Sequence, residues 1–423
     1  MSPRRVLPIL ALLAIVAYLP TLWQPLLEDD YPHLALANYY GALSHWQDLA
    51  HHPFRFRATS EWFLYLAYNA FGLQAAGYYT LTILLHILAT WLVYAMGIWP
   101  VLGFDLAAWA AAFFAVYEGH QEAVMWLSAC NELWQFLFVA AAFVCWLHYL
   151  FGTRDRRWYY VRGLICFALA MISKESAPAF VALLALPLLW EREAWKAFLP
   201  FLALAGVGLY ALYAARNSSF RFQDGSFSLQ APFWRILPEN FARLFWFWGL
   251  LALVWAWKRN RRAVLAGLVW AAVALVPYSF LTYSLRIPSR QTYLASAGLA
   301  WIVAAGIQEV AAWRAKALPV LCTAILLHNI GYLWIKKRRQ YLERAEPTEE
   351  LIAVARRSEG PIYVKCFPRT RLIAEEAVHL GAGRPASDVI WDAAEAQARH
   401  ATATFCYEEK KGGTVQPSAA VPH

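Results

Sequence analysis

Residues 6–33 read VLPILALLAIVAYLPTLWQPLLEDDYPH, an apolar run that ends in three consecutive acids. A helix that crosses a bilayer needs about twenty mostly apolar residues, and residues 6–23 supply such a run directly after Arg4 and Arg5. The basic start is typical of a signal peptide, but the apolar part is long and no small-residue cleavage site follows it. We therefore expect residues 6–23 to be a retained signal anchor.

Apolar runs of similar length recur along most of the chain. The protein has 423 residues, of which 60% are hydrophobic and 15% charged, whereas soluble domains carry about 25% charged residues. This composition excludes a disordered, collagen-like or ordinary soluble protein. The candidate spans are near 6–23, 77–97, 103–118, 132–151, 160–174, 176–190, 197–215, 242–257, 263–283, 293–311 and 317–335. We therefore predict an all-α multi-span membrane protein of about 11 transmembrane helices, with its two termini on opposite sides.

The basic residues predict the orientation of these spans. The net charge is +9, but Lys and Arg fall in short clusters between apolar runs, which excludes nucleic acid as a partner. With the amino end in the cytoplasm, the short inside loops carry Arg4, Arg5, Arg154, Arg156, Arg157, Arg162, Arg192, Lys196, Lys258, Arg259, Arg261, Arg262, Arg314 and Lys316. Residues 336–339 do not fit this orientation, because this basic stretch follows the last apolar run and would lie outside. Either a span is miscounted or the stretch lies against anionic headgroups of the outer leaflet.

The sequence divides into a membrane domain, residues 1–340, and a polar tail, residues 341–423. Residues 24–76 form a first outer loop with a helix suited to the membrane interface. In the tail we expect a small extracytoplasmic α/β domain with helices at 348–358 and 371–380 and strands at 361–366 and 401–407. Its cysteines, Cys366 and Cys406, are expected to form a disulfide if the compartment is oxidising.

Three consecutive acids, Glu28, Asp29 and Asp30, stand at the membrane boundary. They are costly to desolvate and contribute little to topology, so their placement suggests a function. A carboxylate here is able to take a proton from an acceptor hydroxyl or to bind a cation. The alternative is a solvated loop start. The residues leave metal dependence open, and no prosthetic group is expected.

Other charged residues near span ends fall on the same expected side. Ionisable groups at membrane depth usually face one another or a water-filled cavity, so we expect them to meet in one outer cavity. Simpler interpretations stay open: an interfacial turn at Lys174 and Glu175, a packing role for His120, and snorkelling by the two arginines near residue 290. The set comprises His120, Glu122, Lys174, Glu175, Arg286 and Arg290.

Several short stretches, in this order, resemble the GT-C superfamily of membrane glycosyltransferases. The resemblance covers roughly residues 1–310 and is strongest to the protein O-mannosyltransferase-like group and to the membrane region of transmembrane-and-tetratricopeptide-repeat mannosyltransferases. Tyr117 and Glu118 stand where His-Pro is common, and no such repeats follow, so the acceptor class stays open. The stretches are Leu26–His33, Phe54–Ser60, Phe71–Leu73 with Leu84–His86, Ala115–Ser128, Met171–Ser176 and Ser289–Leu294.

The resemblance implies an inverting enzyme that takes a sugar from a polyprenyl-phosphate donor to an acceptor protein, lipid or glycan outside the cytoplasm. Asp29 or Asp30 would be the catalytic base, and the sequence does not decide between them. Lys174, Arg286 and Arg290 would stabilise the departing phosphate. The expected cavity residues are His33, Arg57, His120, Glu122, Glu175 and Tyr293. We expect a multi-pass protein of a bacterial inner membrane with a periplasmic site.

Three other classes of protein compete with this interpretation. A transporter or lipid flippase also has many spans with charges, but it usually shows paired repeats and broken helices at the midplane, and neither is seen here. A polysaccharide ligase or polymerase typically relies on a large late outer loop, whereas the acids here lie in the first loop. A non-catalytic scaffold whose tail binds a partner is the third alternative.

Overall fold

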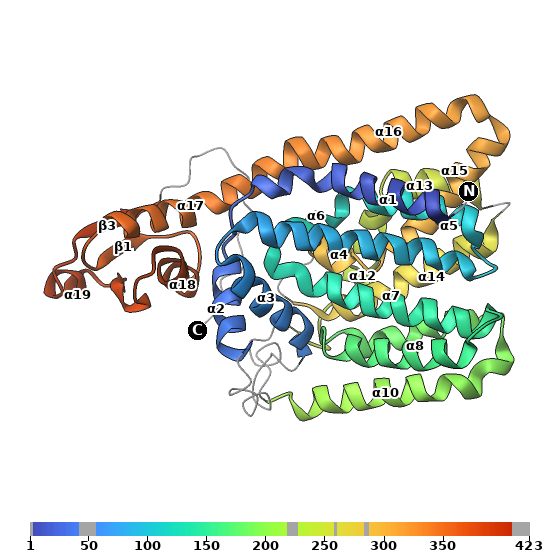
Figure 1. Cartoon of the computed structure of the whole chain (residues 1–423), viewed down its shortest axis with the longest axis horizontal. Helices are drawn as coiled ribbons and strands as arrows, with labels where there is room; N and C mark the ends of the chain where they lie inside the picture. The colour runs from blue at the N-terminus through green and yellow to red at the C-terminus, as the bar shows by residue number, and fades with distance from the viewer. Residues whose placement is uncertain (1–2, 42–55, 218–226, 258–259, 283–286, 408–423) are drawn as a thin grey trace.

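The computed structural model describes residues 3–41, 56–217, 227–257, 260–282 and 287–407. Its helices form one bundle, and the last long helix runs out of the bundle into a small separate domain (Figure 1). That domain lies at the same end of the bundle as α2 (Asp30–Gly41) and α3 (Ala58–Phe71), whereas the N-terminus lies at the opposite end (Figure 1). We call the end that carries α2 and α3 the acidic end.

The remaining elements of the bundle, in chain order, are α1 (Pro3–Tyr18), η1 (Leu19–Trp23), α4 (Ala75–Ala95), η4 (Met96–Ile98), α5 (Gly103–Val116), η5 (Glu118–His120), α6 (Gln121–Met125), η6 (Leu127–Ala129), α7 (Cys130–Phe151), α8 (Arg156–Met171), η7 (Ala177–Phe180), α9 (Val181–Leu184), η8 (Leu186–Leu189), η9 (Arg192–Ala194), α10 (Trp195–Ala214), α12 (Phe233–Phe245), α13 (Trp248–Ala256), α14 (Arg261–Leu275), η10 (Val276–Phe280), η11 (Ser289–Thr292), α15 (Ser296–Trp313), η12 (Ala315–Ala317) and α16 (Leu318–Gly331).

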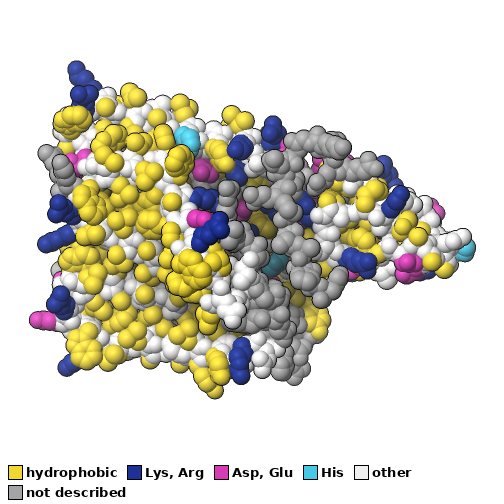
Figure 2. Space-filling model, turned by 180° about the vertical axis from the view of Figure 1, so that it is seen from behind, with side chains coloured by type: hydrophobic (Ala, Val, Ile, Leu, Met, Phe, Trp, Pro, Cys, Tyr) yellow, Lys and Arg dark blue, Asp and Glu magenta, His cyan; other side chains and the backbone are white. Residues whose placement is uncertain are grey.

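Seven helical segments are long and apolar enough to cross a membrane. Within one of them, α4 has 21 residues, and at 1.5 Å per residue it measures about 31 Å, close to the hydrocarbon thickness of a bilayer. Hydrophobic side chains cover the surface of the bundle between its two ends (Figure 2). The seven segments are Arg4–Trp23, Ala75–Ile98, Leu127–Phe151, Arg192–Ala214, Arg261–Phe280, Ser296–Trp313 and Ala315–Arg357.

The other four expected spans are shorter or interrupted. The runs at 103–118 and 160–174 form helices α5 and α8, of 14 and 16 residues. The run at 176–190 is broken into η7, α9 and η8, where Pro178 and Pro187 limit regular helix. The run at 242–257 is divided between α12 and α13 at Phe247, which has a positive φ of 63°. About eleven full spans are therefore not confirmed.

Small residues let two helices of the core approach closely. Gly267 in α14 and Gly298 in α15 face each other so tightly that a Cβ on either one would overlap the carbonyl oxygen of the other. Such small-residue contacts are typical of helices that pack inside a membrane. Large buried rings, including Trp270 and Trp301 with centroids 4.9 Å apart, fill the space beside this contact.

The tail is the expected small α/β domain. After α16, a π-helical turn η13 (Tyr332–Lys337) leads into α17 (Arg338–Arg357). The domain then contains β1 (Ile362–Cys366), α18 (Arg371–Ala382), η14 (Ala386–Asp388), β2 (Val389–Ile390), α19 (Ala393–Ala398) and β3 (Ala403–Cys406). The strands form a parallel sheet in the order β2-β1-β3, with Ile362 paired to Val389 and to Ala403. The sequence missed β2 and α19, which are short.

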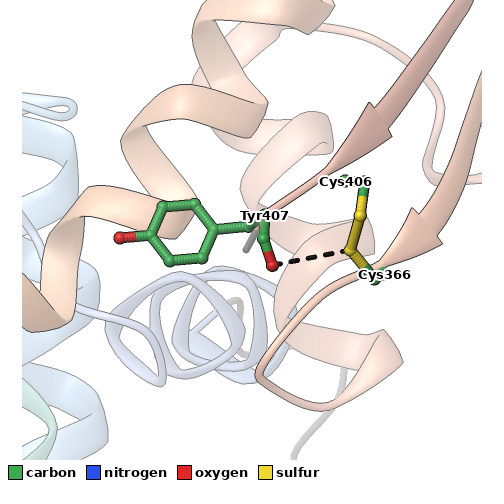
Figure 3. Close-up of a disulfide and its surroundings, with 3 residues drawn as sticks. All are labelled: Cys366, Cys406 and Tyr407. Carbon is green, nitrogen blue, oxygen red and sulfur yellow. Dashed lines mark hydrogen bonds between the residues drawn. A yellow bond between two sulfur atoms is a disulfide. The ribbon is translucent and has the colours of Figure 1, made fainter. Parts of the chain in front are cut away.

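A disulfide and an apolar contact fix this domain. Cys366 and Cys406 join β1 to β3, as expected, and Tyr407 follows directly (Figure 3). Apart from the disulfide, Ile352 of α17 and Ala377 of α18 pack in one buried cluster with Tyr31 and other residues of the segment 24–76. The tail and the segment after the first span therefore share a hydrophobic core.

Candidate active site

The three acids that follow the first span have different environments. Glu28 is 6% exposed and Asp30 is fully buried, whereas Asp29 is partly exposed. Asp30 is the first residue of α2, the helix that follows the end of the first span. The sequence could not distinguish the acids, because their burial and hydrogen-bond partners depend on residues that are distant in the chain.

Asp30 joins the first loop to the start of α7. Its Oδ1 accepts hydrogen bonds from the Ser128 amide at 2.8 Å and hydroxyl at 2.6 Å, and its Oδ2 accepts one from the Leu27 amide at 2.8 Å. Burial raises the pKa of Asp30 to about 6, although these hydrogen bonds oppose the change. Both carboxylate oxygens of Asp30 are thus occupied by hydrogen bonds from the chain itself.

Glu28 ties the same loop to the tail. Arg369 Nε donates to its Oε1 at 2.6 Å, and Arg344 Nη2 donates to its Oε2 at 2.9 Å. Burial alone would raise the pKa of Glu28, but the two guanidinium groups hold it below its ordinary value. Neither arginine was predicted, because nothing in the local sequence marks them.

Asp29 is the acid that packing leaves available. Among the described residues, its carboxylate forms no hydrogen bond or ion pair. Its neighbours Glu28 and Asp30 are held from both sides, so the backbone at Asp29 is fixed while the side chain is partly exposed. Of the two candidates that the sequence left open, the contacts therefore favour Asp29 as the group able to accept a proton.

Two ion pairs extend from this loop towards the start of the broken run at 176–190. His33 Nδ1 lies 3.7 Å from Glu61 Oε1, and Arg57 Nη2 lies 2.7 Å from Glu175 Oε1. Burial would lower the pKa of His33, but the hydrogen bond and charge of Glu61 raise it, and the charge of Asp29 adds to this effect. The two pairs are joined through α3, because Glu61 lies in this helix and Arg57 directly precedes it.

Lys174 lies in a buried polar cluster next to Glu175. Its Nζ pairs with Glu132 and lies 3.4 Å from the Tyr278 hydroxyl. That hydroxyl is 3.1 Å from Glu132 Oε2 and 3.0 Å from Gln135 Oε1. Burial lowers the pKa of Lys174 to about 8, although the charge of Glu132 opposes the change. Tyr278 and Gln135 were missed, because within an apolar run they resemble ordinary packing residues.

Arg290 contacts the other expected acid. Its backbone amide lies 3.1 Å and its Nη1 3.4 Å from Glu122 Oε2. The guanidinium lies over the Trp126 ring, 4.9 Å from the centroid, and Arg344 lies over the same ring at 4.5 Å. Trp126 therefore connects the Arg290 pair to the arginine that holds Glu28. The remaining predicted cation, Arg286, lies outside the described residues.

His120 and Tyr293 are packed in the interior. Both are fully buried, with ring centroids 4.4 Å apart, and His120 Nε2 lies 2.6 Å from the Ser296 hydroxyl. The Tyr293 hydroxyl is 2.6 Å from His86 Nδ1. These contacts place the two residues in an aromatic cluster rather than at an open cavity wall, and they agree with the packing role that the sequence left open for His120.

The charged residues are thus gathered at the acidic end, but a single cavity lined by all of them stays a prediction. One cavity, of about 590 Å³, is lined by Trp99, Trp190 and Arg261 and lies at the opposite end of the bundle. A second, of about 470 Å³, is lined by Glu118, Arg243 and Lys337 rather than by Asp29 or Lys174. Within the described residues, no group of three or more His, Cys, Asp and Glu side chains is arranged to hold a metal ion.

Comparisons with known proteins identify the fold. No protein-family model matches the chain, and no curated protein matches it in sequence. The oligosaccharyltransferase AglB from Archaeoglobus fulgidus, in complex with an inhibitory peptide and a dolichol-phosphate, has a TM-score of 0.56 at 13% identity, over 90% of this chain and 64% of that one. ArnT from Cupriavidus metallidurans, bound to undecaprenyl phosphate, has a TM-score of 0.53 at 14% identity. The match covers 93% of this chain and 91% of that one.

An Archaeoglobus oligosaccharyltransferase tethered with an acceptor peptide gives a TM-score of 0.55 at 12% identity, over 90% of this chain and 63% of that one. The chain thus spans less than two thirds of the length of the archaeal enzyme. The chain shares the fold of these solved enzymes, AglB and ArnT, and its seven apolar helices of spanning length support an integral membrane protein. The narrower O-mannosyltransferase-like resemblance stays a prediction.

Proposed function

We propose that the chain is an inverting membrane glycosyltransferase that moves a sugar from a polyprenyl-phosphate donor to a hydroxyl acceptor. The observation that carries this proposal is the placement of Asp29. In a GT-C fold, it is the acid after the first span whose carboxylate no described residue engages, and it stands between two acids that are firmly held. Polyprenyl phosphates are bound by two proteins of this fold, as dolichol-phosphate in AglB and undecaprenyl phosphate in ArnT.

Asp29 acts as the general base in this proposal. It takes the proton of the acceptor hydroxyl while that oxygen attacks the anomeric carbon. The bond from the anomeric carbon to the phosphate oxygen breaks, and the negative charge that forms on the phosphate is stabilised by Lys174 and Arg290, with Arg286 as a further predicted cation. Because the oxygen attacks opposite the leaving phosphate, the anomeric configuration inverts.

The site faces the extracytoplasmic side. Lys and Arg side chains line the end of the bundle that is far from the tail (Figure 2), and basic loops are typical of the cytoplasmic side. The acidic end and the tail would then lie in the periplasm of a bacterial inner membrane. The tail disulfide agrees with an oxidising compartment.

A transfer assay tests the proposal. The purified chain in lipid vesicles is given a labelled polyprenyl-phosphate sugar and acceptors of the three classes, protein, lipid and glycan. The wild type should transfer label, and Asp29→Asn should lower the rate by about 10²- to 10⁴-fold. Asp105→Asn is the matched control, because Asp105 is an exposed acid of α5. Label that crosses the bilayer while the donor stays intact would instead identify the alternative, a transporter or flippase.

A further inference from the structure

Two cations at the acidic end differ from those of the candidate active site. Arg57, Lys174, Arg290, Arg344 and Arg369 each pair with a carboxylate. Arg243 and Lys337 form no ion pair within the described part of the chain. Arg243 Nη1 donates to the Ile287 carbonyl at 3.1 Å, and Lys337 Nζ donates to Gln340 Oε1 at 3.1 Å. Both keep further donors, and Glu118 interacts with both charges without forming an ion pair with either group.

These two cations line one cavity of about 470 Å³. Its walls come from η5, α12, η11 and η13, so four segments distant in sequence build it. Two phenols in the wall, those of Tyr117 and Tyr332, make no hydrogen bond within the described residues and can donate to a ligand. The lining residues include Tyr117, Glu118, Arg243, Trp246, Tyr332 and Lys337.

The cavity borders the apolar surface of the bundle. Trp246, in its wall, is 74% exposed, and Ile335, on the adjacent π-helical turn, is 77% exposed. Large apolar side chains with such exposure are favoured next to lipid, and Trp is typical of the membrane interface. A ligand in this cavity can therefore keep a polar head among the cations and an apolar tail along the helices.

The π-helical turn η13 ends with two neighbouring lysines whose side chains have different environments. Lys337 lines the cavity, whereas Lys336 is exposed and does not line it. Both ammonium groups lie near the Tyr332 ring: the nitrogen of Lys337 is 5.4 Å from the ring centroid, and that of Lys336 is 5.1 Å from it. Single π turns occur frequently at functional sites. Lys337, one residue of the basic stretch 336–339, thus lines the cavity.

We propose that this cavity binds the phosphate headgroup of a membrane lipid, at a site separate from Lys174 and Arg290. Arg243 and Lys337 supply charge-assisted hydrogen bonds to the phosphate oxygens, and the two phenols add neutral donors. Glu118, in the same wall, opposes an anion by its charge. Burial raises the pKa of Glu118, against the charges of Lys337, His328 and Arg243. The proposal concerns binding alone and does not rest on the proposed sugar transfer.

Binding to the purified full chain tests this site without any measurement of transfer. Native mass spectrometry is run with three probes: phosphatidylglycerol, polyprenyl phosphate and inorganic phosphate. We expect a lipid phosphate to bind the wild type, and Lys337→Gln to weaken its binding by about 10- to 100-fold. Lys336→Gln is the matched control and should bind as the wild type does. Glu118→Gln should bind more tightly.

Each outcome decides the proposal. Binding of phosphatidylglycerol or of polyprenyl phosphate that depends on Lys337 supports the site and identifies the source of the phosphate. Equal binding by Lys337→Gln and the wild type would overturn it, as would equal losses in the Lys336 and Lys337 variants, which would indicate an unspecific basic surface. Binding of inorganic phosphate alone would also overturn it. Arg243→Gln is a second variant, and unchanged thermal unfolding shows that each variant is folded.

Discussion

The guanidinium of Arg369, in the C-terminal tail, donates a 2.6 Å hydrogen bond to Glu28, the residue directly before Asp29. The two partners are 341 positions apart in the sequence. Arg369 follows β1 by three residues, and the disulfide joins the end of that strand to β3. A covalently fixed domain thus holds the backbone next to the proposed base.

Replacement of Arg369 tests whether the tail positions Asp29. We expect Arg369→Ala to lower kcat by about 10- to 100-fold, because small displacements of a reacting group have large effects on rate. KM for the donor should change little. The measurement is the rate of the transfer assay over a series of donor concentrations, which separates kcat from KM.

Arg399→Ala is the matched control for this variant. Arg399 is an exposed arginine of the same tail and pairs with Glu395 at 3.2 Å, far along the chain from the first loop. It should leave both kcat and KM unchanged. If Arg369→Ala keeps the wild-type kcat while the wild type transfers sugar, the positioning role is wrong although the proposed function stands.

The Ser128 hydroxyl should stabilise the fold in a pH-dependent way. It donates to the buried Asp30 carboxylate at 2.6 Å, and hydrogen bonds to charged groups contribute about 1.5–3 kcal/mol. Burial raises the pKa of Asp30 from 3.8 to about 6, so ionisation of Asp30 lowers stability as the pH rises from about 4 to 6. Ser128→Ala should therefore lower the free energy of unfolding most above pH 6, where Asp30 is ionised, and less at pH 5.

Denaturant unfolding at pH 5 and pH 7.5 measures this difference. Ser358→Ala is the control, because its hydroxyl donates to the Val354 carbonyl at 2.9 Å, a group that does not titrate. Its cost should be the same at both pH values. A Ser128→Ala cost that is equal at pH 5 and pH 7.5 would contradict the buried, titrating partner.

Lys174 should set the alkaline limit of the proposed reaction. Its ammonium carries charge below its pKa, which burial lowers to about 8, so transfer should fall as the pH rises above about 8. Lys174→Arg should move this limb to higher pH, because a guanidinium stays charged. Glu132→Gln should move it to lower pH, because Glu132 favours the charged lysine. An identical alkaline limb in all three proteins would remove Lys174 from the mechanism.

The disulfide should stabilise the tail. The Cys366–Cys406 bond closes a loop with a sequence separation of 40, and loss of such a bond typically costs about 2–4 kcal/mol. We expect the Cys366→Ser/Cys406→Ser variant to unfold in its tail at lower denaturant, as followed by hydrogen exchange at residues 362–366. Cys322→Ser, which removes a free cysteine, should have no such effect. Alkylation of both tail cysteines without a reductant would show that the bond is absent.

The sequence predicted the features that depend on short stretches of chain. Apolar runs and their flanking charges indicated the membrane bundle, and seven of the runs match helices of spanning length. Local patterns also indicated β1, α18 and β3 in the tail. The count of spans was less secure, because short apolar runs with Pro178 or Phe247 inside them look like spans until the backbone is seen to break.

The sequence by itself determined that acids follow the first span and that cations stand near other span ends, since both are patterns of neighbouring residues. Only the tertiary structure decided which acid is held and which is available. It enclosed Asp30 through Ser128, bound Glu28 to Arg369, and left Asp29 partly exposed. It also placed His120 and Tyr293 in the core. The physical reason is that burial and hydrogen bonding join residues distant in the chain, and these contacts set the chemistry of each side chain.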